Sequence, residues 1–181
     1  RDIKFDLKRV EGYRNFCNKL WNASRFVLMN LDSKSINFDA EISSQDKWIL
    51  SRLQHVKTEV EKHLADYRLD LMSQTLYEFV WHDYCDWYLE LSKPLLENNK
   101  TKQGCEATLL KVLSETLVLL HPIIPFITEE IYEQSQQLQS NSTGKLISQP
   151  FPEVDKDLLN SEAEAEIDWL KEFILGIRKI R

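Results

Sequence analysis

Apolar residues return every three or four positions through most of the chain, which is the spacing of helices that bury one face. Glycine and proline are scarce, with four Gly and five Pro, and any sheet should be a minor part of the fold. The pattern predicts helices over about 11–31, 43–66, 70–93, 105–121, 125–133 and 161–181. Long helices joined by short loops predict an all-α fold, an antiparallel bundle of about six helices.

Two helix starts carry specific capping signals. Ser43 with Asp46 and Ser161 with Glu164 have the three-residue spacing of a capping box, so we expect Ser43 and Ser161 to be N-caps. We expect the third helix to be disturbed at Pro94, because the residue before a proline avoids helical backbone angles.

The end of the fourth helix and the segment after it contain two prolines. We expect a break at Pro122 and a new helix whose first turn holds Pro125. Residues 134–145 are polar and read as a surface loop, and 146–152 as an extended segment. We expect 1–181 to form one domain, with 1–10 as a linker from a preceding domain.

The first predicted helix has two faces of different character. Its apolar face consists of Phe16, Leu20, Ala23, Val27 and Leu31. Its polar face consists of Arg14, Asn18, Asn22 and Arg25, with Asn15 and Lys19 beside them. Residues 12–31 contain no Asp or Glu, so this face indicates an anionic partner that also offers hydrogen-bonding edges.

Charge is distributed unevenly along the chain. The whole sequence has a net charge of −6, yet residues 1–31 contain seven Lys or Arg and three Asp or Glu. The last 13 residues are also basic, including Arg178, Lys179 and Arg181. A domain that is acidic overall but basic at both ends of its chain can bind nucleic acid on a restricted face.

The cysteines and the hydropathy indicate a cellular compartment. Cys17, Cys85 and Cys105 are odd in number and widely spaced, which is typical of a reducing cytoplasm. No apolar run approaches the 18 or so residues that a membrane span needs. We therefore expect a cytoplasmic protein with no membrane partner.

The sequence offers little support for catalysis or metal binding. Cys85 stands near His82 and two aspartates, but a catalytic triad usually draws its members from distant segments. His55 and His63 are too far apart on one helix to form a metal pair. The glycines are too scattered for a phosphate-binding loop. We expect no catalytic residue, metal or cofactor in these 181 residues.

Four blocks of this sequence resemble the anticodon-binding domain of bacterial valyl-tRNA synthetases: residues 14–30, 84–94, 119–131 and 148–152. The run NKLWNASRF points to the valine family, whereas HPIIPFITEE is shared with isoleucyl and leucyl relatives. The blocks follow the family's order across nearly the whole chain. One departure is Tyr132, where the family usually has Trp.

The resemblance implies a function for a longer parent protein. The parent would attach valine to tRNA(Val) in a reaction that consumes ATP with magnesium. Its catalytic domain, its editing domain and its C-terminal coiled-coil arm are absent here. This chain would bind the anticodon stem-loop without being catalytic, and we expect a monomer.

Helix geometry supplies hypotheses for the tRNA contacts. We assign Arg14, Lys19 and Arg25 to phosphates or base edges, and Asn18 and Asn22 to base edges. Three residues at the start of the second helix are assigned to the anticodon loop: Lys47, Trp48 and Arg52. Trp48 is either a base-stacking platform or a residue at the edge of the core. Two other interpretations remain, namely a helical protein-binding scaffold and the equivalent domain of an isoleucyl, leucyl or methionyl enzyme.

Overall fold

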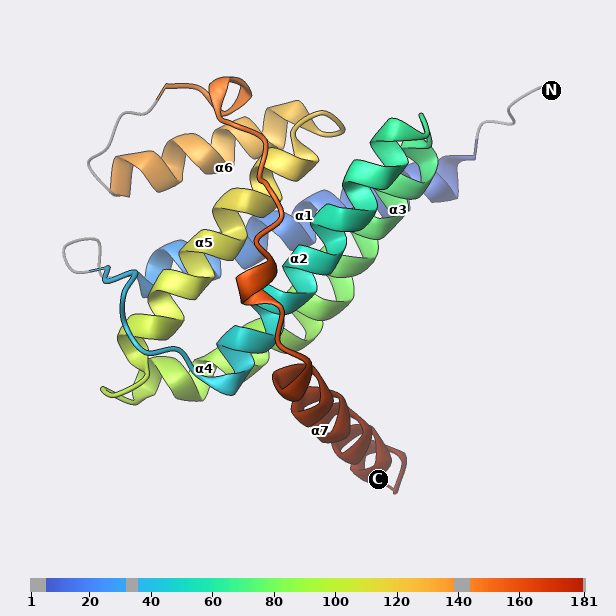
Figure 1. Cartoon of the computed structure of the whole chain (residues 1–181). Coiled ribbons are helices and arrows are strands. Elements are labelled where there is room, and N and C mark those ends of the chain that lie inside the picture. The colour runs from blue at the N-terminus through green and yellow to red at the C-terminus, as the bar shows by residue number, and fades with distance from the viewer. Residues whose placement is uncertain (1–5, 32–35, 139–143, 181) are drawn as a thin grey trace.

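A computed structural model describes residues 6–31, 36–138 and 144–180, and all regular structure within them is helical (Figure 1). The α-helices are α1 (Leu7–Asn30), α2 (Ser44–Ala65), α3 (Leu69–Glu78), α4 (Leu89–Glu97), α5 (Lys102–Leu120), α6 (Pro125–Leu138) and α7 (Ser161–Ile180). A π-helix, η1 (Phe79–Tyr88), joins α3 to α4, and two 3₁₀ turns are η2 (Leu146–Ser148) and η3 (Lys156–Leu158). The prediction of an all-α bundle is confirmed.

Helix α2 lies in the middle of the bundle. It packs against α3, η1, α5 and α7, whereas α1 packs against α5, α6 and η1. The apolar face predicted for α1 is buried, because Phe16, Leu20, Ala23 and Val27 are all at most 6% exposed. Helix α7 packs against α2 and extends beyond one end of the bundle (Figure 1).

The capping box of α2 is confirmed. The Asp46 backbone N–H donates to Ser43 Oγ at 3.3 Å, and the Ser43 N–H donates to Asp46 Oδ2 at 3.0 Å. At α7 the predicted cap is wrong by one residue, because the Ala163 N–H donates to Asn160 Oδ1 at 2.9 Å. Glu164 is consequently free to bind side chains of α2 in place of the helix end.

The segment from Leu69 to Glu97 differs most from the prediction. α3, η1 and α4 follow one another without a break, and the Leu89 N–H donates to the Tyr84 carbonyl five residues back. Pro94 lies inside α4 and does not end it. Pro94 is exposed, so the carbonyl group that loses its helical donor can bond to water instead.

Three smaller expectations also need correction. α1 starts at Leu7 with Asp6 as its N-cap, four residues before the start expected at about residue 11, and residues 1–5 of the expected linker lie outside the described part. α6 extends to Leu138, into the stretch expected to be a loop, and residues 139–143 lie outside the described part. Residues 146–148 form a 3₁₀ turn that buries Leu146, where we expected extended chain.

The prolines between α5 and α6 lie as predicted, with α5 ending at Leu120 and Pro125 as the first residue of α6. All three cysteines are free thiols. In the described part of the chain, no helix has the length and apolar character needed to cross a membrane.

Candidate nucleic-acid interface

The polar face of α1 is exposed, as its pattern predicts. Arg14, Asn18, Asn22 and Arg25 all lie on the side of the helix turned away from the core. Asn18, Asn22 and Arg25 follow each other at intervals of four and three residues, so they form one line along the helix. We call this line, with Arg14 at its start, the α1 ridge.

The charges of the α1 ridge are only partly balanced within the described structure. Arg14 Nη2 is 3.3 Å from Glu11 Oε1, and the two side chains are 68% and 64% exposed. An ion pair this exposed contributes little to stability and is easily broken, so it does not prevent Arg14 from binding a phosphate. Arg25 is exposed and forms no ion pair with any described residue.

Lys19 lies differently from the sequence-based assignment. Its Nζ is 2.5 Å from Asp86 Oδ1 and 3.9 Å from the ring centre of Trp81, both on η1. A carboxylate therefore balances its charge, and Lys19 contributes less to the field of the α1 ridge than the sequence suggested.

Of the three residues assigned to the start of α2, Lys47 is the cation that pairs with none of the described carboxylates. Lys47 is exposed, whereas Arg52 Nε donates to Asp83 Oδ2 at 3.0 Å. Trp48 is 0% exposed, and Lys171 Nζ of α7 lies 4.1 Å from its ring centre. The stacking hypothesis for Trp48 is wrong for this structure, because a base cannot reach a ring that the core and α7 enclose.

The π-helix η1 lies between α1 and α2 and was missed as part of the site. Asp83 binds Arg52 of α2 and Lys171 of α7, at 3.0 and 3.3 Å, and Asp86 binds Lys19 of α1. η1 therefore holds the basic residues of three helices in place.

Two partly exposed aromatic residues of η1 carry cations over their rings. Lys19 lies over Trp81, and Lys171 and Arg178 lie 5.7 and 5.9 Å from the Trp87 ring centre. Trp87 is only partly buried. The two tryptophans are six positions apart, a spacing that puts them on different faces of an ordinary α-helix, so helical periodicity could not have paired them.

The titratable residues of η1 include one thiol and one histidine. Burial raises the pKa of the Cys85 thiol to about 12, which opposes formation of a nucleophilic thiolate. His82 Nδ1 lies 3.3 Å from Asp86 Oδ2 on the exposed surface. Within residues 6–31, 36–138 and 144–180, no three His, Cys, Asp or Glu side chains form a group that could hold a metal ion.

Comparison with known proteins gives the class of this helical bundle. A family model described as the anticodon-binding domain of tRNA ligase matches residues 46–181, and the chain belongs to this family. The match starts within α2, so α1 lies before it.

The relatives extend the similarity to the whole chain. The valine–tRNA ligases of Legionella pneumophila strains Lens, Paris and Philadelphia 1 are each 49% identical to it over 188 residues. Each alignment covers 100% of this chain and 20% of the ligase, so the chain spans about a fifth of the length of these relatives. The resemblance to valyl-tRNA synthetases is confirmed.

Proposed function

We propose that this chain is the anticodon-binding module of a valine–tRNA ligase and binds the anticodon stem-loop of tRNA(Val). Similarity at 49% identity over the whole chain, α1 included, is the observation that carries the proposal. The longer parent attaches valine to the tRNA with ATP and magnesium, through catalytic and editing domains and with a coiled-coil arm that lie outside these residues. The parent acts as a monomer in the cytoplasm, where three free thiols are stable.

The α1 ridge suits a single-stranded RNA loop. Unpaired anticodon bases can turn outward and expose the edges that a duplex hides. The side-chain amides of Asn18 and Asn22 each offer two donors and one acceptor oxygen, and the two residues lie one helical turn apart. Arg25, at the end of the same line, is placed to bind the adjacent phosphate or a base edge.

Because Trp48 is buried, we assign base stacking to the two tryptophans of η1 in its place. Trp81 and Trp87 are partly exposed, and a base would stack there by replacing the cation that now lies over the ring, Lys19 on Trp81 and Lys171 on Trp87. Each base stacked on an aromatic ring contributes on the order of 1–3 kcal/mol. Lys47 and Arg52 at the start of α2 would bind the phosphates on the other side of η1.

The electrostatic step can be tested with one substitution. Arg25→Ala should weaken binding of the tRNA(Val) anticodon stem-loop and flatten the log–log salt slope by about 0.7, the value for one lost phosphate contact on single strands. Filter binding at several salt concentrations measures both. Lys62→Ala removes another exposed cation, at the far end of α2, and should leave affinity and slope unchanged. Equal effects of the two substitutions would remove Arg25 from the interface.

The choice of tRNA is tested separately. The chain should bind the tRNA(Val) anticodon stem-loop more tightly than the same stem-loop carrying an isoleucine anticodon, because base-edge contacts are lost with the wrong base. Asn22→Ala should reduce that preference more than Arg25→Ala does. A preference for the isoleucine anticodon would assign the module to a sibling enzyme, and equally weak binding of both stem-loops would favour a protein-binding scaffold.

A further inference from the structure

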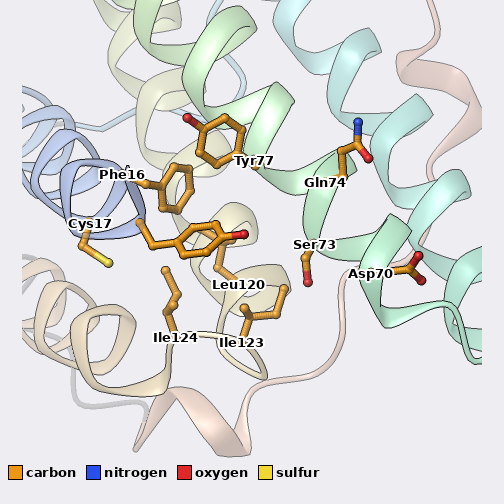
Figure 2. Close-up of a pocket in the computed structure, with 10 residues that line it drawn as sticks. Phe16, Cys17, Asp70, Ser73, Gln74, Tyr77, Leu120, Ile123 and Ile124 are labelled. Carbon is orange, nitrogen blue, oxygen red and sulfur yellow. The ribbon is translucent and has the colours of Figure 1, made fainter. Parts of the chain in front are cut away.

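A cavity of about 830 Å³ lies between the first half of α1, one side of α3 and the turn from α5 to α6 (Figure 2). Its lining residues are Tyr13, Phe16, Cys17, Asp70, Ser73, Gln74, Tyr77, Leu120, Ile123 and Ile124. We call it the α1–α3 pocket. It is formed by a different part of α1 from the line of Asn18, Asn22 and Arg25.

The pocket has an apolar floor and a short polar rim. Figure 2 shows the Phe16 and Tyr77 rings next to each other with Leu120 and Ile124 below Phe16, and Ser73 and Gln74 of α3 on the right-hand side. The Phe16 and Tyr77 rings are stacked at 5.0 Å, so the aromatic wall is fixed. A pocket of this kind suits a hydrophobic side chain whose backbone meets the polar rim.

The charges at the pocket argue against an RNA partner. Its lining contains no Lys or Arg. Asp70 is the one charged lining residue, and Arg68 binds its carboxylate through two nitrogens at 2.9 and 2.8 Å. A phosphate would meet a carboxylate here and no free cation, whereas an apolar protein segment meets no unpaired charge.

Exposed apolar side chains continue the surface around the pocket. Tyr13 and Ile123 line the pocket and are 63% and 39% exposed, and Val10 precedes Tyr13 by one turn on the same side of α1. Leu69, next to Asp70 at the start of α3, is 61% exposed. An apolar cavity with an apolar border on one end of a bundle indicates a protein interface.

We propose that an apolar segment of the longer parent polypeptide, from outside these 181 residues, covers the α1–α3 pocket. The relatives are about five times as long as this chain, so a parent of that length would have about four-fifths of its residues outside the bundle, close enough through the chain connection to cover the pocket. A second copy fits poorly, because two concave pockets facing each other across a two-fold axis would enclose empty space. The proposal rests on the existence of the longer parent and not on tRNA binding.

Cys17 makes the occupancy of the pocket measurable. Burial raises the pKa of Cys85 and of Cys105 to about 12, so both keep their protons at pH 8 and react slowly with alkylating reagents. The rate of Cys17 modification by N-ethylmaleimide, followed by mass spectrometry of its peptide, should be at least about tenfold lower in the parent than in the 181-residue chain. That factor corresponds to a docked fraction above about 90%.

Two substitutions in the parent separate docking from general burial. Ile123→Arg puts a charge at the pocket border and should return the Cys17 rate to that of the 181-residue chain. Ile147→Arg, at a residue 74% exposed outside the pocket lining, should leave Cys17 protected. If circular dichroism shows that Ile123→Arg loses helix, Ile123→Gln takes its place with the same expected direction.

The remaining outcomes contradict the proposal. Equal Cys17 rates in the parent and in the 181-residue chain would show an uncovered pocket. A rate that falls as the concentration of the 181-residue chain rises would assign the pocket to a second copy. Ile123→Arg should leave the affinity of the 181-residue chain for the anticodon stem-loop unchanged, so a failure of the tRNA proposal and a failure of the docking proposal give different results.

Discussion

At the scale of single residues, Lys57 is a buried charged side chain of α2 with partners on two other segments. It is 2% exposed, and its Nζ lies 2.5 Å from Glu115 Oε2 of α5 and 3.0 Å from the Glu153 carbonyl oxygen. A buried cation is tolerated only when acceptors surround it, since removal from water costs several kcal/mol per ion. Lys57 thus connects α2 to α5 and to the chain before η3.

Removing one partner of the Lys57–Glu115 ion pair should destabilise the folded protein. Lys57→Met should lower the free energy of unfolding by about 3–5 kcal/mol, because it leaves the Glu115 carboxylate without a partner in a largely buried place. Glu115→Gln added to Lys57→Met should recover a large part of that loss, since no unpaired charge remains. Urea denaturation of the two variants and of Glu115→Gln alone gives the comparison. Equal losses in Lys57→Met and in the double variant would show that the ion pair is not the source.

The candidate site shows which residue positions a sequence can place. Arg25 and the two ridge asparagines could be placed because exposure along a helix follows from its periodicity alone. The ion pairs of Lys19 and Arg52 could not, because their partners lie 67 and 31 residues further along the chain. The burial of Trp48 was the hardest feature to predict, because part of its cover comes from Lys171 of α7, which is far away in the sequence.

At the scale of elements, two helical glycines have opposite roles. A Cβ on Gly104, in the first turn of α5, would collide with the Glu41 carbonyl oxygen and lie 3.0 Å from the Glu41 carbonyl carbon. Gly12, in α1, has nothing within 4 Å of such an atom. The close approach of α5 to the chain before α2 therefore requires glycine at 104 but not at 12.

These two positions predict changes of opposite sign. Gly104→Ala should lower the melting temperature, because backbone atoms of residues 41–42 have to move away from α5. Gly12→Ala should stabilise the protein by about 0.5–1 kcal/mol, the usual difference between Ala and Gly inside a helix. Thermal unfolding followed by circular dichroism tests both, and a gain in stability from Gly104→Ala would contradict the close approach.

Local signals predicted the elements well wherever the cause is local. The capping box at Ser43 and the helix start at Pro125 each depend on a few adjacent residues, and both are confirmed. The π-helix η1 depends instead on packing between α1 and α2, and no local signal announces it. The predicted helix break at Pro94 was wrong for a related reason. A proline ends a helix or is tolerated in it depending on whether the carbonyl group that loses its donor faces the core or water.

At the scale of the whole molecule, η1 and its neighbours place several weak acids in the core. Burial raises the pKa of Cys85 and Cys105 to about 12 and the pKa of Tyr84 and Tyr88 well above 10. The folded protein therefore keeps protons that the unfolded chain releases above about pH 9. Stability contributed by these groups is fully present below that pH and is lost as the pH rises toward 12.

The alkaline loss can be assigned to one residue. Each group that is protonated only in the folded state lowers the free energy of unfolding by up to about 1.4 kcal/mol per pH unit between its two pKa values. Cys85→Ala removes one such group, so the loss of stability between pH 8 and pH 11 should shrink by about 1–2 kcal/mol relative to the original chain. Urea denaturation at both pH values measures the difference, and Ser73→Ala, which removes no titrating group, serves as the control. An unchanged loss in Cys85→Ala would mean that the Cys85 thiol ionises at the same pH in the folded and unfolded chains, and that Tyr84, Tyr88 and Cys105 account for the alkaline instability.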